Sequence, residues 1–194
     1  MPLGLSAWEH RFSVDIYGIR DTIEYVTTTL LDPGHCPDYT KVPSPDDPVF
    51  RFHKVGFYEE FEVLGYTGMA LPVPHAVPAA GFQVASDDTT LFYTGDTGRG
   101  LSDAWKHSAP DVLLTEVTFG NDNEELADKI GHLTPQMLSD TLEVFKEENG
   151  FLPIIIVSHM NPPWEQAVRS EIKEISSRLG IEIIVSEPDQ TIRL

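Results

Sequence analysis

Two carboxylates stand where their side chains could do chemistry, in the stretch from residue 91 to residue 118. The apolar segment Leu91–Tyr93 runs into Thr-Gly-Asp-Thr-Gly, so Asp96 stands between two glycines. Because glycine permits tight turns and close backbone approach, this arrangement can project the aspartate from a strand end into a cleft. A second apolar segment, Asp111–Val117, carries Glu116 near its end. Ligands bind beyond the carboxyl ends of strands in α/β sheets, which makes both acids site candidates.

Three histidines occupy comparable positions. His75 lies in Pro-Val-Pro-His-Ala-Val-Pro, where the prolines stiffen the loop. His132 stands in Gly-His-Leu-Thr before a predicted helix, and His159 directly follows an apolar run. Imidazole nitrogen and carboxylate oxygen are the usual ligands of catalytic zinc, and manganese and iron accept the same set. Because His75, Asp96 and His159 each follow a predicted strand, they are candidate metal ligands at one sheet edge.

Each candidate also has a purely structural alternative. Asp96 fits a simple turn, because Asp and Gly are common turn residues. Glu116 fits an exposed strand-end residue, and a single loop histidine is often a hydrogen-bonding surface residue. The coincidence of suitable ligand types at several strand ends favours the metal site. The remaining histidines lack such a context and are interpreted as structural: His10, His35, His53 and His107.

The elements that must position these residues begin close to the start of the chain. Residues 12–19 alternate apolar and polar side chains, which predicts a strand. Asp21 is then a predicted helix N-cap, with Glu24 completing a capping box. The following helix should bury one apolar face, formed by Ile23, Val26, Leu30 and Leu31.

The pattern of predicted secondary structure changes at Asp96. Residues 49–93 are rich in predicted strands, after which strands and helices alternate. Thr134-Pro135 predicts a helix start with a capping threonine and an N1 proline. The continuous apolar run Pro153–Val157 indicates a strand covered on both faces, and Pro162-Pro163 opens a further helix.

Length and composition restrict the class of protein. The chain has 194 residues, enough for one well-buried domain. Thirty-one acidic against 13 basic residues give a formal charge of −18, which argues against binding long nucleic acids. It leaves room for a small anionic substrate held by metal ions, although such a charge can also serve solubility alone.

Membrane and export signals are not evident in the sequence. No apolar run is long enough to cross a bilayer, and the first residues lack the features of a signal peptide. A single cysteine, Cys36, excludes an intrachain disulfide. We therefore expect a cytoplasmic protein with no membrane partner.

Four ordered motifs carry a family resemblance. TGDTG, TEVTF, GHLTP and IIVSHM follow one another, with His75 upstream. The chain resembles the metallo-β-lactamase superfamily, and most of all its phosphodiesterase branch of ribonuclease Z and class II cyclic-nucleotide phosphodiesterases. The resemblance runs from about residue 8 to residue 194. It implies an α/β fold, the αββα sandwich, with residues 1–194 as one domain forming the C-terminal majority of that fold.

The resemblance also implies roles for the candidate residues. The family residue matching His75 binds the first metal, that matching Asp96 bridges both metals, and that matching His159 binds the second. The one matching His132 contacts the substrate phosphate and assists proton transfer, and the one matching Glu116 belongs to the second shell or the proton relay. The implied cofactors are two Zn²⁺ ions in a complete site, with Mn²⁺ or Fe²⁺ as alternatives. A hydroxide bridging the two metals would attack the phosphodiester.

One family signature is missing. H-x-H-x-D-H is absent from the sequence, since no two of the seven histidines stand two residues apart. Relatives carry that motif upstream of the segment matching residues 1–12, so we expect an N-terminally incomplete member with an open sheet edge. Three ligands cannot hold two ions, so we expect weak or no binding of a metal pair.

The expected function is that of a metallo-hydrolase that cleaves a small anionic phosphodiester, such as a nucleotide or an RNA end. Whether the chain is active without the H-x-H-x-D-H motif is left open at this point. One alternative is an acyl hydrolase of the same fold acting on a lactone, thioester or β-lactam. Another is a non-catalytic truncated member with an incomplete metal site. The histidine of GHLT favours the phosphodiesterase. The family also suggests a homodimer.

Overall fold

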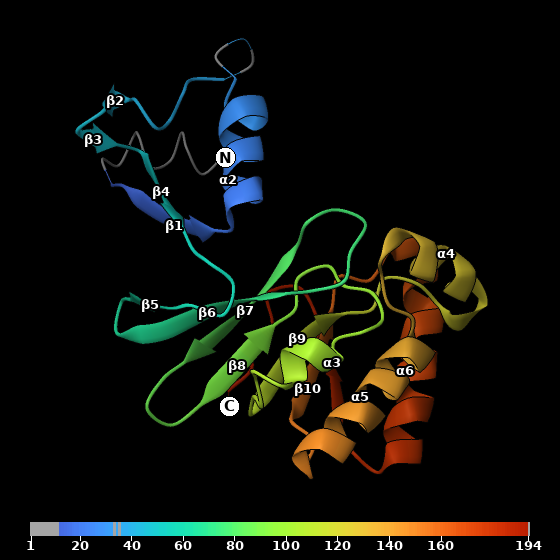
Figure 1. Ribbon diagram of the computed structural model, residues 1–194. Coiled ribbons are helices and arrows are strands. Elements are labelled where there is room, and N and C mark those ends of the chain that lie inside the picture. Colours follow the sequence, from blue (N-terminus) through green and yellow to red (C-terminus); the bar gives the residue numbers. More distant parts are fainter. Residues whose placement is uncertain (1–11, 33, 35, 194) are drawn as a thin grey trace. The chain divides into compact units, whose positions relative to one another are not determined.

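The computed structural model describes residues 12–32, 34 and 36–193 (Figure 1). The chain divides into two compact units, Met1–Glu59 and Glu60–Leu194, and the single domain expected for residues 1–194 stays a prediction. The segment on which the expected lack of a signal peptide rests, residues 1–11, lies outside the described residues. Among the described helices, none combines the length and apolar character that a membrane crossing requires.

The first unit is built around a pair of parallel strands and a helix. Strand β1 (Val14–Gly18) pairs with β4 (Phe50–Lys54), so the strand predicted within residues 12–19 is confirmed. Between them lie helix α2, a π-helical turn and a short hairpin, which span Arg20–Tyr25, Val26–Leu30, Pro43–Ser44 (β2) and Asp47–Pro48 (β3).

The predicted capping box of this helix is wrong. Helix α2 begins at Arg20 after an extended Ile19, and no side chain caps it, so Asp21 already lies in the first turn. The predicted apolar face is only partly right. Ile23 is buried, but Leu30 is 56% exposed, because the π-helical turn changes the angular spacing of side chains on which the prediction depended.

The second unit contains a seven-stranded sheet with the order β11-β10-β9-β8-β7-β6-β5. Neighbouring strands from β5 to β8 are antiparallel, and those from β8 to β11 are parallel. Strands β6, β8, β9, β10 and β11 therefore run in one direction and end at one edge of the sheet. The strands are Glu60–Val63 (β5), Tyr66–Pro72 (β6), Ala80–Ala85 (β7), Thr90–Tyr93 (β8), Val112–Glu116 (β9), Ile154–Ser158 (β10) and Ile183–Val185 (β11).

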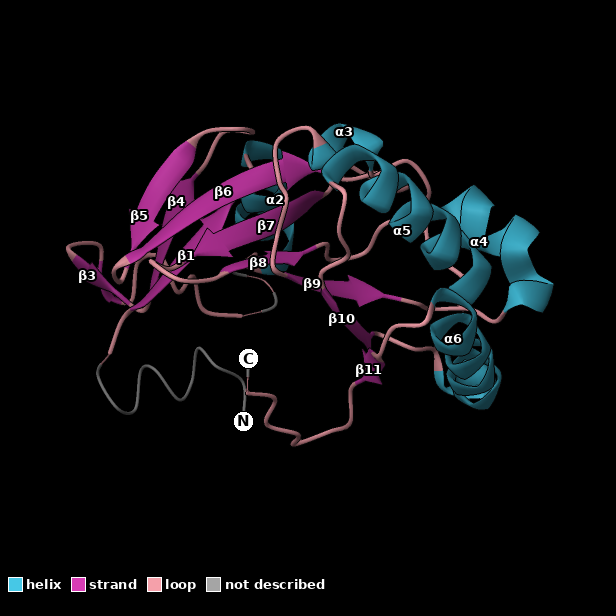
Figure 2. Cartoon of the chain, turned by 90° about the horizontal axis from the view of Figure 1, so that it is seen from below, coloured by secondary structure: helices cyan, strands magenta, loops and turns pink. Residues whose placement is uncertain are grey.

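Helices cover one face of the parallel strands (Figure 2). Helix α5 starts where predicted, because the Thr134 side chain accepts a hydrogen bond from the Met137 N–H and Pro135 follows the cap. Aromatic and aliphatic side chains of α5 and α6 pack against those of β8 to β10 in a single core. The predicted α/β class is confirmed. The helices are Ser102–Trp105 (α3), Glu124–Ile130 (α4), Pro135–Asn149 (α5) and Glu165–Leu179 (α6).

Candidate metal centre

The shared edge of the sheet in the second unit collects the predicted site residues. His75 and Asp96 each lie three residues beyond their strands, β6 and β8. Glu116 is the last residue of β9, and His159 directly follows β10. His132 reaches the same place from the loop between α4 and α5. The structure thus brings together all five residues selected from the sequence.

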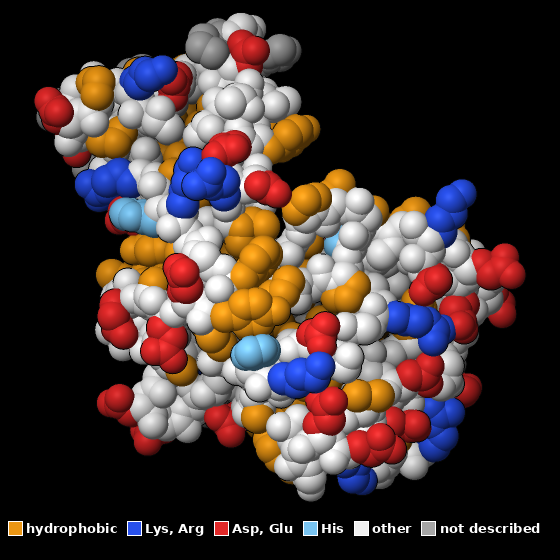
Figure 3. Space-filling model, in the orientation of Figure 1, with side chains coloured by type: hydrophobic (Ala, Val, Ile, Leu, Met, Phe, Trp, Pro, Cys, Tyr) orange, Lys and Arg blue, Asp and Glu red, His pale blue; other side chains and the backbone are white. Residues whose placement is uncertain are grey.

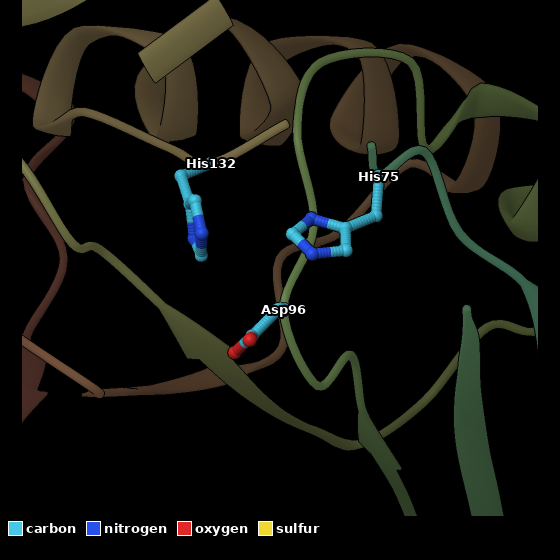
Figure 4. A group of neighbouring side chains, drawn as sticks. All are labelled: His75, Asp96 and His132. Carbon is cyan, nitrogen blue, oxygen red and sulfur yellow. The ribbon is translucent and has the colours of Figure 1, made fainter. Parts of the chain in front are cut away.

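The Asp96 carboxylate lies among imidazoles. One ligand atom each from His75, Asp96 and His132 lie within 4.8 Å of one another, and Figure 4 shows these side chains converging on a common space. The His159 Nδ1 atom is 3.3 Å from the Asp96 Oδ1 atom. The Asp96 side chain is 45% exposed, so its oxygens remain open to a ligand from solution.

Hydrogen bonds to neighbouring oxygen atoms fix the tautomers of the His75 and His132 rings. The His75 Nδ1 atom lies 2.7 Å from the carbonyl oxygen of Gly131, and a carbonyl can only accept, so this nitrogen carries the proton. The His132 Nδ1 atom lies 2.5 Å from the Glu116 Oε1 atom and donates in the same way. In each neutral ring the lone pair is therefore on Nε2, as in histidines that bind metals.

Glu116 is 1% exposed, which overturns the alternative of an exposed strand-end residue. Its oxygens accept hydrogen bonds from the backbone N–H groups of Thr97, Thr118 and Leu133, at 3.0, 3.0 and 3.3 Å. The carboxylate also accepts hydrogen bonds from the Nδ1–H group of His132 at 2.5 Å and from the Thr118 hydroxyl at 2.6 Å. With its lone pairs occupied in this way, the carboxylate orients His132 and has little capacity left for a cation.

The Thr118 side chain links the Glu116–His132 pair to His159. Its hydroxyl donates to Glu116, lies 3.3 Å from the His159 Nδ1 atom and 3.2 Å from the carbonyl oxygen of His159. Glu116, His132 and His159 also offer ligand atoms within 4.8 Å of one another, but the saturated carboxylate makes this group a hydrogen-bonded relay. Thr118 is not among the site residues predicted from the sequence, although its spacing of two from Glu116 is a signal for the same face of a strand.

Glycine allows the loops of the site to approach one another. Gly131 has a φ of 75°, and a Cβ atom there would lie 2.7 Å from the Cα atom of His75. A Cβ atom on Gly98 would lie 3.1 Å from the Cα atom of Gly131. The loops that carry His75, Asp96 and His132 therefore pack backbone against backbone. Gly131, which directly precedes His132, is not among the site residues predicted from the sequence.

The donor set fits a divalent cation. His75, Asp96 and His159 offer two imidazoles and an open carboxylate, with His132 beside them, and these are ligand types that Zn²⁺, Mn²⁺ and Fe²⁺ accept. The fixed Nδ1–H groups of His75 and His132 aim lone pairs rather than protons at a ligand. The division of these residues between a first and a second metal stays a prediction.

Comparison with known proteins gives a family and a set of folds. The model of the family described as "Beta-lactamase superfamily domain" matches residues 7–168. Unliganded yeast PDE1 has a TM-score of 0.76 at 14% identity, covering 90% of this chain and 58% of that one. Zn²⁺-bound PqqB from Methylobacterium extorquens has a TM-score of 0.70 at 15% identity, covering 98% and 68%. Human tRNase Z, short form, has a TM-score of 0.54 at 18% identity, covering 79% of this chain and 62% of that one.

The chain thus spans less than two thirds of the yeast PDE1 chain that it matches. No curated protein sequence matches it.

Proposed function

The chain belongs to the beta-lactamase superfamily, and on that basis we propose that it is a metal-dependent hydrolase of phosphodiesters. Membership confirms the predicted metallo-β-lactamase type of α/β fold. The observation that carries the proposal is the Asp96 carboxylate among three imidazoles, with the buried Glu116–His132 pair alongside. Yeast PDE1 and human tRNase Z, among the similar folds, support a phosphodiester as the substrate.

The cation would be held by His75, Asp96 and His159, and Zn²⁺ is the ion we propose, with Mn²⁺ or Fe²⁺ as alternatives. A divalent cation there supplies Lewis-acid polarisation of a phosphoryl oxygen and activation of water. Asp96 would supply the open carboxylate of this ligand set, because imidazoles surround it and its side chain is 45% exposed. The hydrogen bond from His75 to Gly131 keeps the His75 ring turned toward the cation.

His132 and Glu116 handle the proton in this proposal. The His132 Nδ1–H donates to Glu116, so Nε2 is the nitrogen that can receive a proton and pass it to the leaving oxygen. Glu116 holds the ring in position, as a buried carboxylate behind a catalytic histidine does. Thr118 fixes the other Glu116 oxygen.

The substrate that we propose is small: a nucleotide or the end of an RNA, hydrolysed in the cytoplasm. A formal charge of −18 opposes the approach of a long polyanion. On the face drawn in Figure 3, acidic side chains are scattered among the other residues, with fewer basic ones between them. A short diester carries little charge and is repelled less.

A second candidate function is acyl hydrolysis, which the description of the matching family favours. A panel of chromogenic esters, tested beside bis(p-nitrophenyl) phosphate with Zn²⁺ or Mn²⁺, separates the two. We expect metal-dependent cleavage of the phosphodiester that His132→Gln lowers by at least about 100-fold. The proposal would be contradicted if the esters were cleaved faster than the phosphodiester. It would also be contradicted if His132→Gln lowered the cleavage of neither kind of substrate.

A further inference from the structure

Arg99 lies three residues after Asp96, in the loop that follows strand β8. Its guanidinium forms ion pairs with carboxylates from two helices. The Nη2 atom contacts the Glu124 Oε1 atom, the Nε atom lies 3.7 Å from the Asp128 Oδ1 atom, and the Nη1 atom lies 3.3 Å from the Asp140 Oδ2 atom. The first two carboxylates belong to α4 and the third to α5. One side chain therefore ties the Asp96 loop to both helices.

The same two helices flank the segment that presents His132, which lies between the end of α4 and the start of α5. The Asp96 loop packs against this segment beside Arg99. A Cβ atom on Gly98 would lie 3.1 Å from the Cα atom of Gly131, so the two backbones are already in contact there. Arg99 therefore spans a junction between two loops that each carry a site residue.

Hydrogen bonds continue this junction to the ring of His132. The Thr97 N–H group donates to the Glu116 Oε1 atom at 3.0 Å, and the His132 Nδ1–H group donates to the same oxygen. Thr97 directly follows Asp96 in the loop. A movement of this loop relative to α4 and α5 therefore changes the separation of the Asp96 carboxylate and the His132 ring.

The charges of the cluster make the position of these helices depend on Arg99. Three carboxylates face one guanidinium, so their negative charges outnumber its positive charge. Glu124 and Asp128 also stand four residues apart on one helix, where like charges repel. The Arg99 side chain is 40% exposed, and partly exposed ion pairs contribute little to global stability. Loss of the guanidinium should therefore loosen the junction rather than unfold the chain.

We propose that Arg99 is a positioning residue of the candidate metal centre, which holds the loop of Asp96 against the helices on either side of His132. The role needs no contact between Arg99 and the cation, because the ion pairs to α4 and α5 supply it. The inference rests on the proposed function, since the geometry that Arg99 maintains is that of the proposed site.

Hydrogen exchange of backbone amides tests the junction in the metal-free chain. The N–H groups of Thr97 and Gly98 donate to Glu116 and to the carbonyl oxygen of Pro74. In Arg99→Gln we expect both amides to exchange at least about tenfold faster, while those of strand β10 keep their rates. Unchanged exchange of the loop would overturn the proposal. Equal acceleration in β10 would also overturn it, because Arg99 would then act on global stability alone.

Titration with Zn²⁺ gives a second readout, in which the sign of the change separates position from charge. Arg99→Gln removes a positive charge three residues from Asp96, which by itself would strengthen the binding of a cation. A displaced ligand set predicts the opposite, and we expect the affinity for Zn²⁺ to fall by at least about tenfold. Stronger or unchanged binding in Arg99→Gln would overturn the proposal.

Lys129→Gln is the matched control, because it removes one positive charge from an exposed position of α4. It should not weaken Zn²⁺ binding, and an equal loss in this variant would refute a specific role for Arg99. Glu124→Gln adds a double-mutant cycle. Because it already breaks one ion pair of the guanidinium, Arg99→Gln should lower the affinity less in that background than in the unaltered chain. Fully additive losses would contradict the proposed contact.

The two proposals can fail separately. Faster exchange confined to the loop of Arg99→Gln, in a chain that hydrolyses no phosphodiester, would leave Arg99 assigned and refute the enzyme. Metal-dependent hydrolysis together with unchanged loop exchange in Arg99→Gln would do the reverse.

Discussion

At the scale of single residues, the two carboxylates of the site differ in how much of each the protein itself occupies. It faces three imidazoles but remains 45% exposed, whereas Glu116, at 1% exposed, has its oxygens filled by protein donors. Two carboxylates at neighbouring strand ends therefore have different capacities. One is open to a cation, and the other is committed to positioning His132.

Replacing Asp96 tests the cation site directly. We expect calorimetric titration of the unaltered chain with Zn²⁺ to show at most one tight site, because the converging ligands surround a single open carboxylate. Asp96→Asn should weaken that site by at least about tenfold, since the amide loses the charge that favours the ion. Two tight sites, or unchanged affinity in the variant, would contradict this assignment.

Replacing Glu116 tests the buried pair. Glu116→Gln puts an amide N–H₂ among groups that already donate, including the His132 ring and the backbone of Thr97 and Thr118. The free energy of unfolding should fall by about 1–3 kcal/mol, measured in urea. Glu125→Gln, at an exposed position of α4, is the control and should change it by less than about 0.5 kcal/mol.

At the scale of elements, local patterns predicted the start of α5 but not that of α2, and they carried no information about long-range contacts. The start of α5 follows from Thr134 and Pro135, a capping signal contained in a few residues. The five site residues could be selected because each stands beside a readable strand or helix. The burial of Glu116 and the contact of Gly131 with His75 depend on residues far along the chain, and a local pattern does not carry that information.

The glycine contact between loops leads to a paired prediction. Gly131→Ala would place a Cβ atom 2.7 Å from the backbone of His75, whereas Gly150→Ala, at a similar φ of 78°, meets nothing within 4 Å. Both should lose about 1–2 kcal/mol from the strained backbone, and Gly131→Ala about 1–3 kcal/mol more. Only Gly131→Ala should weaken Zn²⁺ binding. Equal losses in urea unfolding would show that the loops do not press together.

The parallel pair of strands in the first unit carries a pH-dependent contact. Hydrogen bonds from His53 and Arg51 lower the pKa of Asp15 below its ordinary value of 3.8. A lowered pKa in the folded state means that Asp15 stabilises the unit above the unfolded pKa and loses this effect as the pH falls through the folded value. The difference in melting temperature between the chain and Asp15→Asn should therefore be larger at about pH 6 than at about pH 2.

The control for this contact is Asp46→Asn, at an exposed position of the same unit. It should show a smaller change between the two pH values. A constant difference for Asp15→Asn would mean that the contact with His53 and Arg51 does not act on stability.

At the scale of the whole molecule, charge separates short substrates from long ones. Proteins that bind nucleic acids through basic side chains lose affinity as salt rises, because they release counterions. A chain with a formal charge of −18 should behave in the opposite way toward a polyanion, since salt screens their mutual repulsion. The direction of the salt effect therefore reports whether long RNA is a natural substrate.

We expect kcat/KM for an RNA of about 20 nucleotides to rise as salt increases from about 50 to 200 mM. The kcat/KM for a dinucleotide should change little with salt, because a dinucleotide carries only one phosphodiester charge. This kcat/KM should also exceed that for the long RNA at every salt concentration. The two substrates share the same scissile bond, so the comparison isolates the field of the protein from the chemistry at Asp96. A kcat/KM for long RNA that falls steeply with salt would indicate a basic binding surface and would contradict the small-substrate proposal.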